Sequence, residues 1–151
     1  MGLKRAFFFK ELCEGFISEL AVKYYDGKHP KHFLWVDHYK FITNNINPGE
    51  KVMDIGCGAS LSYNLELAKN QIVVDAVDIN PALIQKCKTE KRLENINFRL
   101  LDITKELPDQ QYDTVILSHI LEHLSDPAEL LRKLHKITQK IILRLPRYDD
   151  H

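Results

Sequence analysis

The stretch 52–59 constrains the fold more than any other part of this sequence. It begins with apolar residues around Asp54 and continues into the turn Gly56-Cys57-Gly58. An apolar run of this kind is typical of a strand that is covered on both faces of a sheet. Two glycines so close together allow a tight turn and a close approach of the backbone to a ligand. With a helix starting near Ser60, the stretch predicts the first half of a nucleotide-binding βαβ unit.

Leu61 stands where a dinucleotide-binding site would usually carry a third glycine. In those sites the third glycine lets the helix pack close to a pyrophosphate. The pattern therefore favours a ligand without a pyrophosphate, and an NAD-linked enzyme is the less favoured alternative.

Strand and helix patterns alternate along the rest of the chain. The expected strands are 51–55, 72–79, 98–101, 112–118 and 140–145, and the expected helices between them are 60–70, 81–92 and 127–137. The polar segment 104–111 is too short for a helix, so we expect a turn there. This alternation predicts the α/β class, with a Rossmann-like, doubly wound and mainly parallel sheet.

Two further helices are expected before the first strand, at 3–25 and 32–45, where apolar residues recur at steps of three and four. We therefore divide the chain into an N-terminal helical cap, residues 1–47, and a Rossmann-like core, residues 48–151. Both parts are expected to form a single compact domain.

Composition excludes several classes of partner. Lys plus Arg equals Asp plus Glu, at 21 each, which gives no reason to expect a nucleic acid or an acidic lipid. The three cysteines, Cys13, Cys57 and Cys87, are scattered, so we expect neither a disulfide framework nor a zinc site. Reduced thiols, no signal peptide and no run of about 20 apolar residues together predict a cytoplasmic protein.

Asp78 lies at the end of the second expected strand, twenty residues after Gly58. An acidic residue at that place can accept hydrogen bonds from both hydroxyls of a ribose. The alternative is a solvated carboxylate in a loop. Asp75 falls in the middle of the same strand, so we expect it to lie away from the ligand.

Four motifs fall at the ends of the expected strands: Asp54-x-Gly56-x-Gly58, Asp78, Asp102-Ile103 and 118–123. Together they resemble the class I S-adenosylmethionine-dependent methyltransferases. The phrase 112–116 leading to Leu-Glu-His-Leu at 121–124 and Asp-Pro at 126–127 resembles the small-molecule, type 11/12-like branch of that family. The resemblance covers about residues 50–147.

The resemblance implies the strand order 3-2-1-4-5, S-adenosylmethionine as the cofactor and S-adenosylhomocysteine as the product. It implies that the Asp102 carboxylate bonds the adenine amino group and that Ile103 packs on the ring. The cofactor-binding residues that it implies are Asp54, Gly56, Cys57, Gly58, Asp78, Ile79, Asp102, Ile103, Ser118 and His119.

His119 and His123 are the candidate catalytic bases, because they follow the fourth strand. His119, Glu122 and His123 are spaced i, i+3, i+4, so in a helical turn they share a face. Some relatives bind a divalent metal with Glu-x-x-Glu-His here, and this chain has His119 in place of the first Glu. A base, a metal ligand and a purely structural or cofactor-shaping role stay open, and we expect no bound metal.

The function predicted is methyl transfer from S-adenosylmethionine to a small molecule. The acceptor is not expected to be DNA, because the chain lacks the Asn/Asp-Pro-Pro-aromatic run of the DNA amino-methyltransferases after the fourth strand. The alternatives are a non-catalytic cofactor-binding or interaction module of the same fold, or a truncated fragment of a longer methyltransferase.

The family resembled continues with two further strands, and this sequence ends before them. The strand 140–145 would then lie at an open edge of the sheet. An apolar edge with unpaired N–H and C=O groups is a template for another strand. We therefore expect that two copies can pair through this edge as a homodimer.

Overall fold

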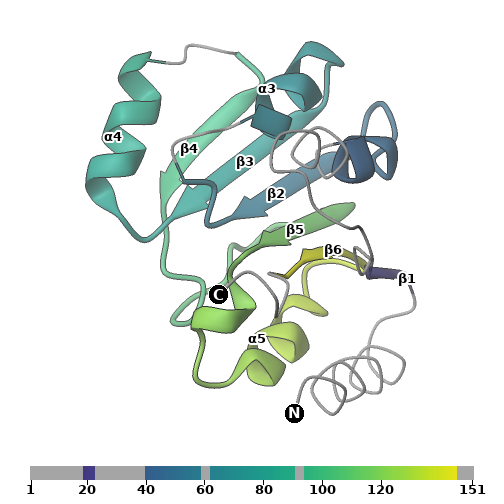
Figure 1. The fold of residues 1–151 in the computed structure, drawn as a ribbon, viewed down its shortest axis with the longest axis vertical. Helices are drawn as coiled ribbons and strands as arrows, with labels where there is room; N and C mark the ends of the chain where they lie inside the picture. The colour runs from purple at the N-terminus through teal and green to yellow at the C-terminus, as the bar shows by residue number, and fades with distance from the viewer. Residues whose placement is uncertain (1–18, 23–39, 59–61, 91–93, 146–151) are drawn as a thin grey trace, which may run out of the picture.

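A six-stranded sheet forms the centre of the molecule (Figure 1). The computed structural model describes residues 19–22, 40–58, 62–90 and 94–145. The strands are β1 (Glu19–Val22), β2 (Lys51–Ile55), β3 (Val73–Asp78), β4 (Ile96–Leu100), β5 (Thr114–Ser118) and β6 (Lys140–Arg144). The helices bounded within these ranges are α3 (Ser62–Lys69), α4 (Pro81–Glu90), α5 (Pro127–Leu134) and a short 3-10 helix (Leu121–His123).

All neighbouring strands of the sheet run parallel, in the order β1-β6-β5-β2-β3-β4. The five strands from β2 onward have the predicted order 3-2-1-4-5, which confirms the fold class. The segment 104–111 forms no helix, as expected. Residues 40–44 are helical, within the helix expected at 32–45; its first part, 32–39, lies outside the described residues.

The first expected helix is wrong at residues 19–22, which form strand β1 beside β6. The rest of that range, 3–18 and 23–25, lies outside the described residues. Ala21 pairs with Ile142 in the β1–β6 register, so two segments about 120 positions apart complete one ladder. A local apolar period carries no information about such a distant partner. The division at residue 47 stays a prediction, although β1 belongs to the sheet of the core.

The edge of β6 is therefore not open, which corrects the expectation for 140–145. Its backbone groups on that side face β1, whose four residues pair with the first four of β6. The homodimer was expected because of an exposed edge at this strand. With that edge occupied by β1, the structure gives this mode of pairing no support.

Apolar residues alternate between the two faces of the sheet, as the pleat of a strand requires. One face carries α3, α4 and the end of the helix at 40–44. Its core contains Ile42, Ile46, Val52, Leu67, Val74, Ala76, Ile84, Phe98, Ile116 and Ile142. The other face carries α5, and its core contains Met53, Ile55, Val77, Val115, Leu117, Leu130, Leu131, Leu134, Ile141 and Leu143. Helices on both faces make this a doubly wound fold.

A polar network lies on the α5 face of β3 and β4, at a place where the connection to β5 contains no helix. The buried Asp75 carboxylate accepts hydrogen bonds from the Tyr112 hydroxyl at 2.7 Å, from Asn97 Nδ2 at 2.8 Å and from the Gln110 amide. The Arg99 guanidinium lies 4.0 Å away. Burial and this carboxylate raise the pKa of Tyr112 to about 12. As expected from its mid-strand position, Asp75 lies away from the carboxyl ends of the strands.

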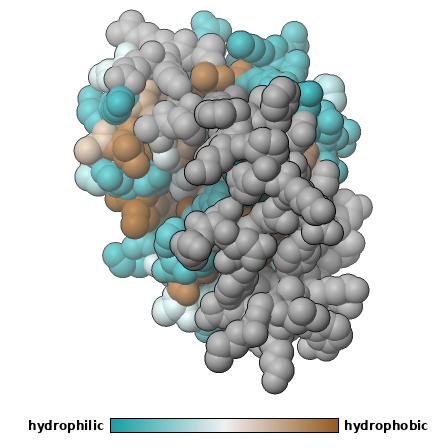
Figure 2. Space-filling view, viewed as in Figure 1, coloured by the Kyte–Doolittle hydropathy of each residue, from teal (hydrophilic) through white to brown (hydrophobic). Residues whose placement is uncertain are grey.

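The visible surface is mixed in character (Figure 2). Hydrophobic areas lie on the side of the molecule that carries α4 and β4, among hydrophilic residues. In the described ranges, no helix has the length and apolar content needed to cross a membrane.

The role of β1 as an edge cover can be tested by removing its backbone donors. Leu20→Pro together with Ala21→Pro leaves no N–H at either position, so the strand cannot form its ladder with β6. We expect the average mass in static light scattering to rise with concentration, because the uncovered β6 edge pairs with other chains. The control replaces both residues by threonine, which keeps both N–H groups. A proline variant that stays monomeric at every concentration would show that β1 does not protect the edge.

Candidate functional site

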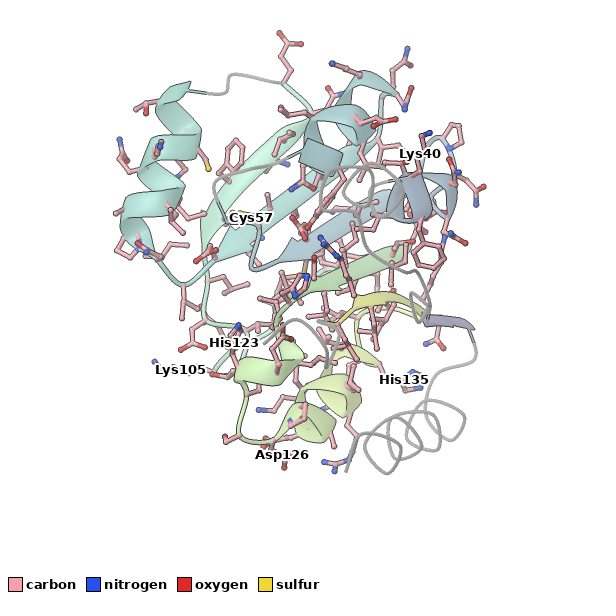
Figure 3. The ribbon with its side chains drawn as sticks, viewed as in Figure 1. Lys40, Cys57, Lys105, His123, Asp126 and His135 are labelled. Carbon is pink, nitrogen blue, oxygen red and sulfur yellow. The ribbon has the colours of Figure 1, made fainter. Side chains whose placement is uncertain are left out.

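The site lies where the strand order reverses, at the carboxyl ends of β2, β3 and β5. Open parallel sheets bind ligands at such a switch point. Figure 3 shows Cys57 in the turn after β2 and His123 in the segment after β5, both at this edge of the sheet. The turn and the segment after β5 are therefore the two sides from which a ligand can be held.

The glycine turn is anchored by its backbone to β3. The N–H groups of Gly56 and Cys57 both donate to the Val77 carbonyl, at 2.8 and 3.0 Å. Gly56 and Gly58 have φ values of 71° and 57°, in the region where a Cβ is disfavoured. A Cβ at Gly56 would overlap the side chain of Ile120. At Gly58 it would meet no atom within 4 Å, so the backbone there borders open space.

Asp78 closes the turn from the neighbouring strand. Its Oδ2 accepts from the Gly58 N–H at 3.1 Å and its Oδ1 from the Asn80 N–H at 2.9 Å. A carboxylate has about four acceptor positions, so each oxygen keeps capacity for one more donor. The Asn80 side chain in turn accepts from the Ala82 N–H at 2.9 Å, which fixes the start of α4. The predicted partners Gly58 and Asp78 are thus in direct contact.

Asp54 is fully buried beneath the turn. The Tyr63 hydroxyl donates to its Oδ1 at 2.8 Å and Asn64 Nδ2 donates to its Oδ2 at 2.6 Å. Burial raises the pKa of the Asp54 carboxyl to about 6, and the nearby negative charge of Asp78 adds to the effect. Its oxygens face α3, so the structure makes Asp54 a link between β2 and α3; a contact with the cofactor stays a prediction.

Sequence reasoning did not identify Tyr63, Asn64 or Ile120. Tyr63 and Asn64 are buried polar residues in the first turn of α3, and such residues need hydrogen-bonding partners. This requirement could have predicted the two hydrogen bonds, because Asp54 is the acidic residue of the preceding strand. The packing of Ile120 against Gly56 joins two segments that are distant in the sequence, so no local pattern predicts it.

The two described cysteines, Cys57 and Cys87, are buried. Burial raises the pKa of the Cys57 thiol well above its usual value, and the charges of Asp54 and Asp78 raise it further. The Cys87 thiol lies 3.5 Å from the Gly58 carbonyl oxygen. Since the thiolate is the reactive form of cysteine, Cys57 serves here as a small residue that packs within the turn.

Asp102 follows β4 and is held by its own loop. Its Oδ1 accepts from the Thr104 N–H and hydroxyl, at 3.1 and 2.6 Å, and Lys105 Nζ lies 2.9 Å from its Oδ2. These bonds lower the pKa of the Asp102 carboxyl to about 2. Ile103 is buried in the core of the α5 face, so its packing on an adenine ring stays a prediction.

Two large apolar residues at this edge are exposed. Ile79 is 69% exposed directly after Asp78, and Leu100 is 57% exposed at the end of β4. Asp78 and Leu100 are register partners in the β3–β4 ladder. Ile79 was a predicted site residue, whereas Leu100 was not.

His119 has an unusual backbone and a nearby carboxylate. Its φ is 56°, its N–H donates to the Arg144 carbonyl at 2.9 Å, and its Nδ1 lies 3.2 Å from Glu122 Oε1. Burial and the charge of Arg144 lower the pKa of the His119 imidazole, so it is neutral at pH 7. Ser118 ends β5 opposite Arg144.

The structure pairs His119 with Glu122 but not with His123, whose side chain is exposed. The three residues do not share one face of a helix, because only 121–123 form a 3-10 turn. In the described part of the chain, no three His, Cys, Asp or Glu side chains are arranged to hold a metal ion.

Known proteins resemble this chain over most of its described length. The family model described as "Methyltransferase domain" matches residues 46–146. The ubiquinone biosynthesis O-methyltransferase of Coxiella burnetii is 33% identical over an alignment of 122 residues, which covers 76% of this chain and 52% of that protein. The demethylmenaquinone methyltransferase of Tropheryma whipplei is 29% identical over 82 residues, which are 54% of this chain and 34% of that protein.

Solved structures of the same fold include a coclaurine N-methyltransferase with bound N-methylheliamine and S-adenosylhomocysteine. It has a TM-score of 0.64 at 24% identity, over 83% of this chain and 40% of that one. The magnesium protoporphyrin IX methyltransferase of Synechocystis, with bound S-adenosylmethionine, has a TM-score of 0.56 at 22% identity, over 78% and 64%. The chain spans about half the length of the ubiquinone biosynthesis O-methyltransferases that it matches.

The pKa of Asp54 gives a prediction for stability. An Asp whose folded-state pKa lies near 6 instead of 3.8 binds its proton more tightly in the folded state, so stability falls as pH rises from about 4 to 6. Asp54→Asn removes this loss, so its free energy of unfolding relative to wild type should be roughly 2–3 kcal/mol more favourable at pH 7 than at pH 4. Urea unfolding at both pH values measures this difference. An equal effect of the substitution at the two pH values would contradict the assigned pKa.

Proposed function

Because the chain belongs to the methyltransferase-domain family, we propose that it binds S-adenosylmethionine at the turn 56–58 and transfers a methyl group to a small molecule. The contact between the Gly58 N–H and the Asp78 carboxylate carries the proposal. The contact brings a carboxylate with unused acceptor positions next to a turn whose backbone borders open space at Gly58. The chain spans about half of its curated relatives, so activity of these 151 residues is part of the proposal.

The residues at the strand ends carry the chemical groups that binding of the cofactor requires. Asp78 has one free acceptor position on each oxygen for the two ribose hydroxyls. Exposed Ile79 offers an apolar surface for the adenine ring, and half-buried Asp102 offers an acceptor for its amino group. We assign Gly56, Cys57 and Gly58 to the methionine part of the cofactor, with Asp54 beneath them. Ser118 and Ile103 are proposed as further contacts of the cofactor.

When bound, S-adenosylmethionine supplies a methyl group on a positively charged sulfur. The chain's part is then to orient the acceptor and exclude water, which can account for much of the rate. His119 is neutral at pH 7 and is oriented by Glu122, so it can accept the proton of an acceptor hydroxyl. The arrangement supports His119 as the catalytic base in preference to His123.

The curated relatives suggest the acceptor class. One is named for O-methylation in ubiquinone biosynthesis and another for methylation of demethylmenaquinone. We propose a small aromatic acceptor with a hydroxyl group, and neither a nucleic acid nor a membrane as partner. The free thiol of Cys57 agrees with a cytoplasmic location, which is part of the proposal.

The alternative is a module of the same fold that binds the cofactor without turnover. Both candidates bind S-adenosylhomocysteine, so binding does not separate them. Transfer of a labelled methyl group from S-adenosylmethionine to a set of phenols and catechols separates them, since only the enzyme forms a labelled product.

Asp78→Ala tests the cofactor site. The substitution removes two charge-assisted hydrogen bonds to the ribose, each worth about 1.5–3 kcal/mol. We expect the affinity for S-adenosylhomocysteine, measured by calorimetry, to fall at least tenfold. Asp109→Ala, at an exposed carboxylate in the loop after β4, is the matched control. If Asp78→Ala binds as tightly as wild type while keeping its fold, the ribose lies elsewhere.

His119→Gln tests the base. Loss of a positioned base typically lowers kcat by 10² to 10⁴, while cofactor affinity should change little. His135→Gln is the control, because His135 is exposed at the end of α5. Should His123→Gln lose activity in the phenol assay while His119→Gln retains it, the roles of the two histidines are reversed.

A further inference from the structure

Two carboxylates at the glycine turn have no cationic partner among the described residues. Asp54 accepts hydrogen bonds from the neutral side chains of Tyr63 and Asn64, and Asp78 accepts them from two backbone N–H groups. In the described ranges, neither forms an ion pair with a Lys, Arg or His.

Other buried or half-buried carboxylates of the sheet do have cationic partners. Glu50 lies 3.0 Å from Lys140 Nζ, and Asp75 lies 4.0 Å from the Arg99 guanidinium. A buried charge without a partner is costly. Among the described residues, the pair at the turn thus differs from these two carboxylates, and it lies at the proposed ligand site.

The two carboxylates act on the same region. The negative charge of Asp78 contributes to the raised pKa of Asp54, so the two groups are close enough to interact through the protein. The Arg144 guanidinium also acts on this edge of the sheet, because its charge contributes to the pKa values of Tyr63 and His119. In the described structure, however, Asp54 and Asp78 are bonded only to neutral groups, so their two charges favour a ligand with a positive charge.

We propose that the buried Asp54 carboxylate makes the site discriminate by charge, favouring the cationic methyl donor relative to the neutral thioether product. This inference rests on the proposed function. Donor and product differ by one methyl group and one positive charge on sulfur, and they share the ribose, the adenine and the amino acid part. Asp78 would bond ribose hydroxyls that both ligands have, whereas Asp54 is fully buried and acts on a ligand only through its charge.

The local structure allows this charge to be removed with little rearrangement. Asn64 Oδ1 is buried and has no hydrogen-bond partner in the described structure. In Asp54→Asn, the retained oxygen can still accept from the Tyr63 hydroxyl. A flip of the Asn64 amide lets its Oδ1 accept from the introduced NH₂ group, so both links to α3 are kept.

The experiment is calorimetry of the whole chain with S-adenosylmethionine and with S-adenosylhomocysteine at pH 7.5. The quantity compared is the ratio of the two Kd values, donor over product. We expect Asp54→Asn to raise this ratio about fivefold or more, because the loss of a nearby buried charge weakens binding of the cationic ligand selectively. Asp75→Asn is the matched control: it neutralises a buried carboxylate of the neighbouring strand, away from the turn, and should leave the ratio unchanged.

The other outcomes would overturn the role of Asp54. An unchanged ratio in folded Asp54→Asn, or an equal change in Asp75→Asn, rejects discrimination by Asp54. An Asp54→Asn chain that fails to fold also rejects it, because the ionised carboxylate would then support the fold instead of opposing it. If wild type binds neither ligand, the proposed function itself fails, and the inference fails with it.

Discussion

The hydrogen bonds from α3 to the buried Asp54 carboxylate fix the geometry on which the site depends. They join the end of β2 to the helix that follows the glycine turn, so the turn is held at both of its ends. The backbone hydrogen bonds from Gly56 and Cys57 to β3 then fix the position of the turn relative to the sheet. Because burial raises the pKa of the Asp54 carboxyl to about 6, the ionised form of this link is held at a cost to stability.

The segment after β5 is tied to this turn by packing. Ile120 fills the space beside Gly56 that a side chain would need, and His119 is held by the backbone of β6 and by Glu122. The segment after β5, which would hold the acceptor, is thus in contact with the glycine turn, which would hold the cofactor. In a transfer reaction this contact matters, since small errors in the separation of the reacting groups slow the reaction strongly.

Elsewhere the sheet uses other means to complete its core and its edge. The connection between β4 and β5 has no helix, and the hydrogen-bonded network around Asp75 occupies the sheet face there. At the opposite side, β1 supplies the backbone partners that β6 would otherwise lack. Both features follow from one requirement, that buried polar groups and strand edges be paired.

The sequence by itself determined the alternation of strands and helices, the turn at 56–58 and the placement of Asp78, because these depend on local patterns and because the carboxyl ends of parallel strands lie at one edge of the sheet. It also gave the start of α5, where Asp126 accepts from the Glu129 N–H at 2.9 Å. The strand order was implied by the resemblance to the methyltransferases. Only the tertiary structure decided that β1 covers β6, that Ile120 packs on Gly56, and that α3 binds the Asp54 carboxylate. These contacts join segments whose partners no local period or motif specifies, and their energies depend on burial and charge that arise once the chain has folded.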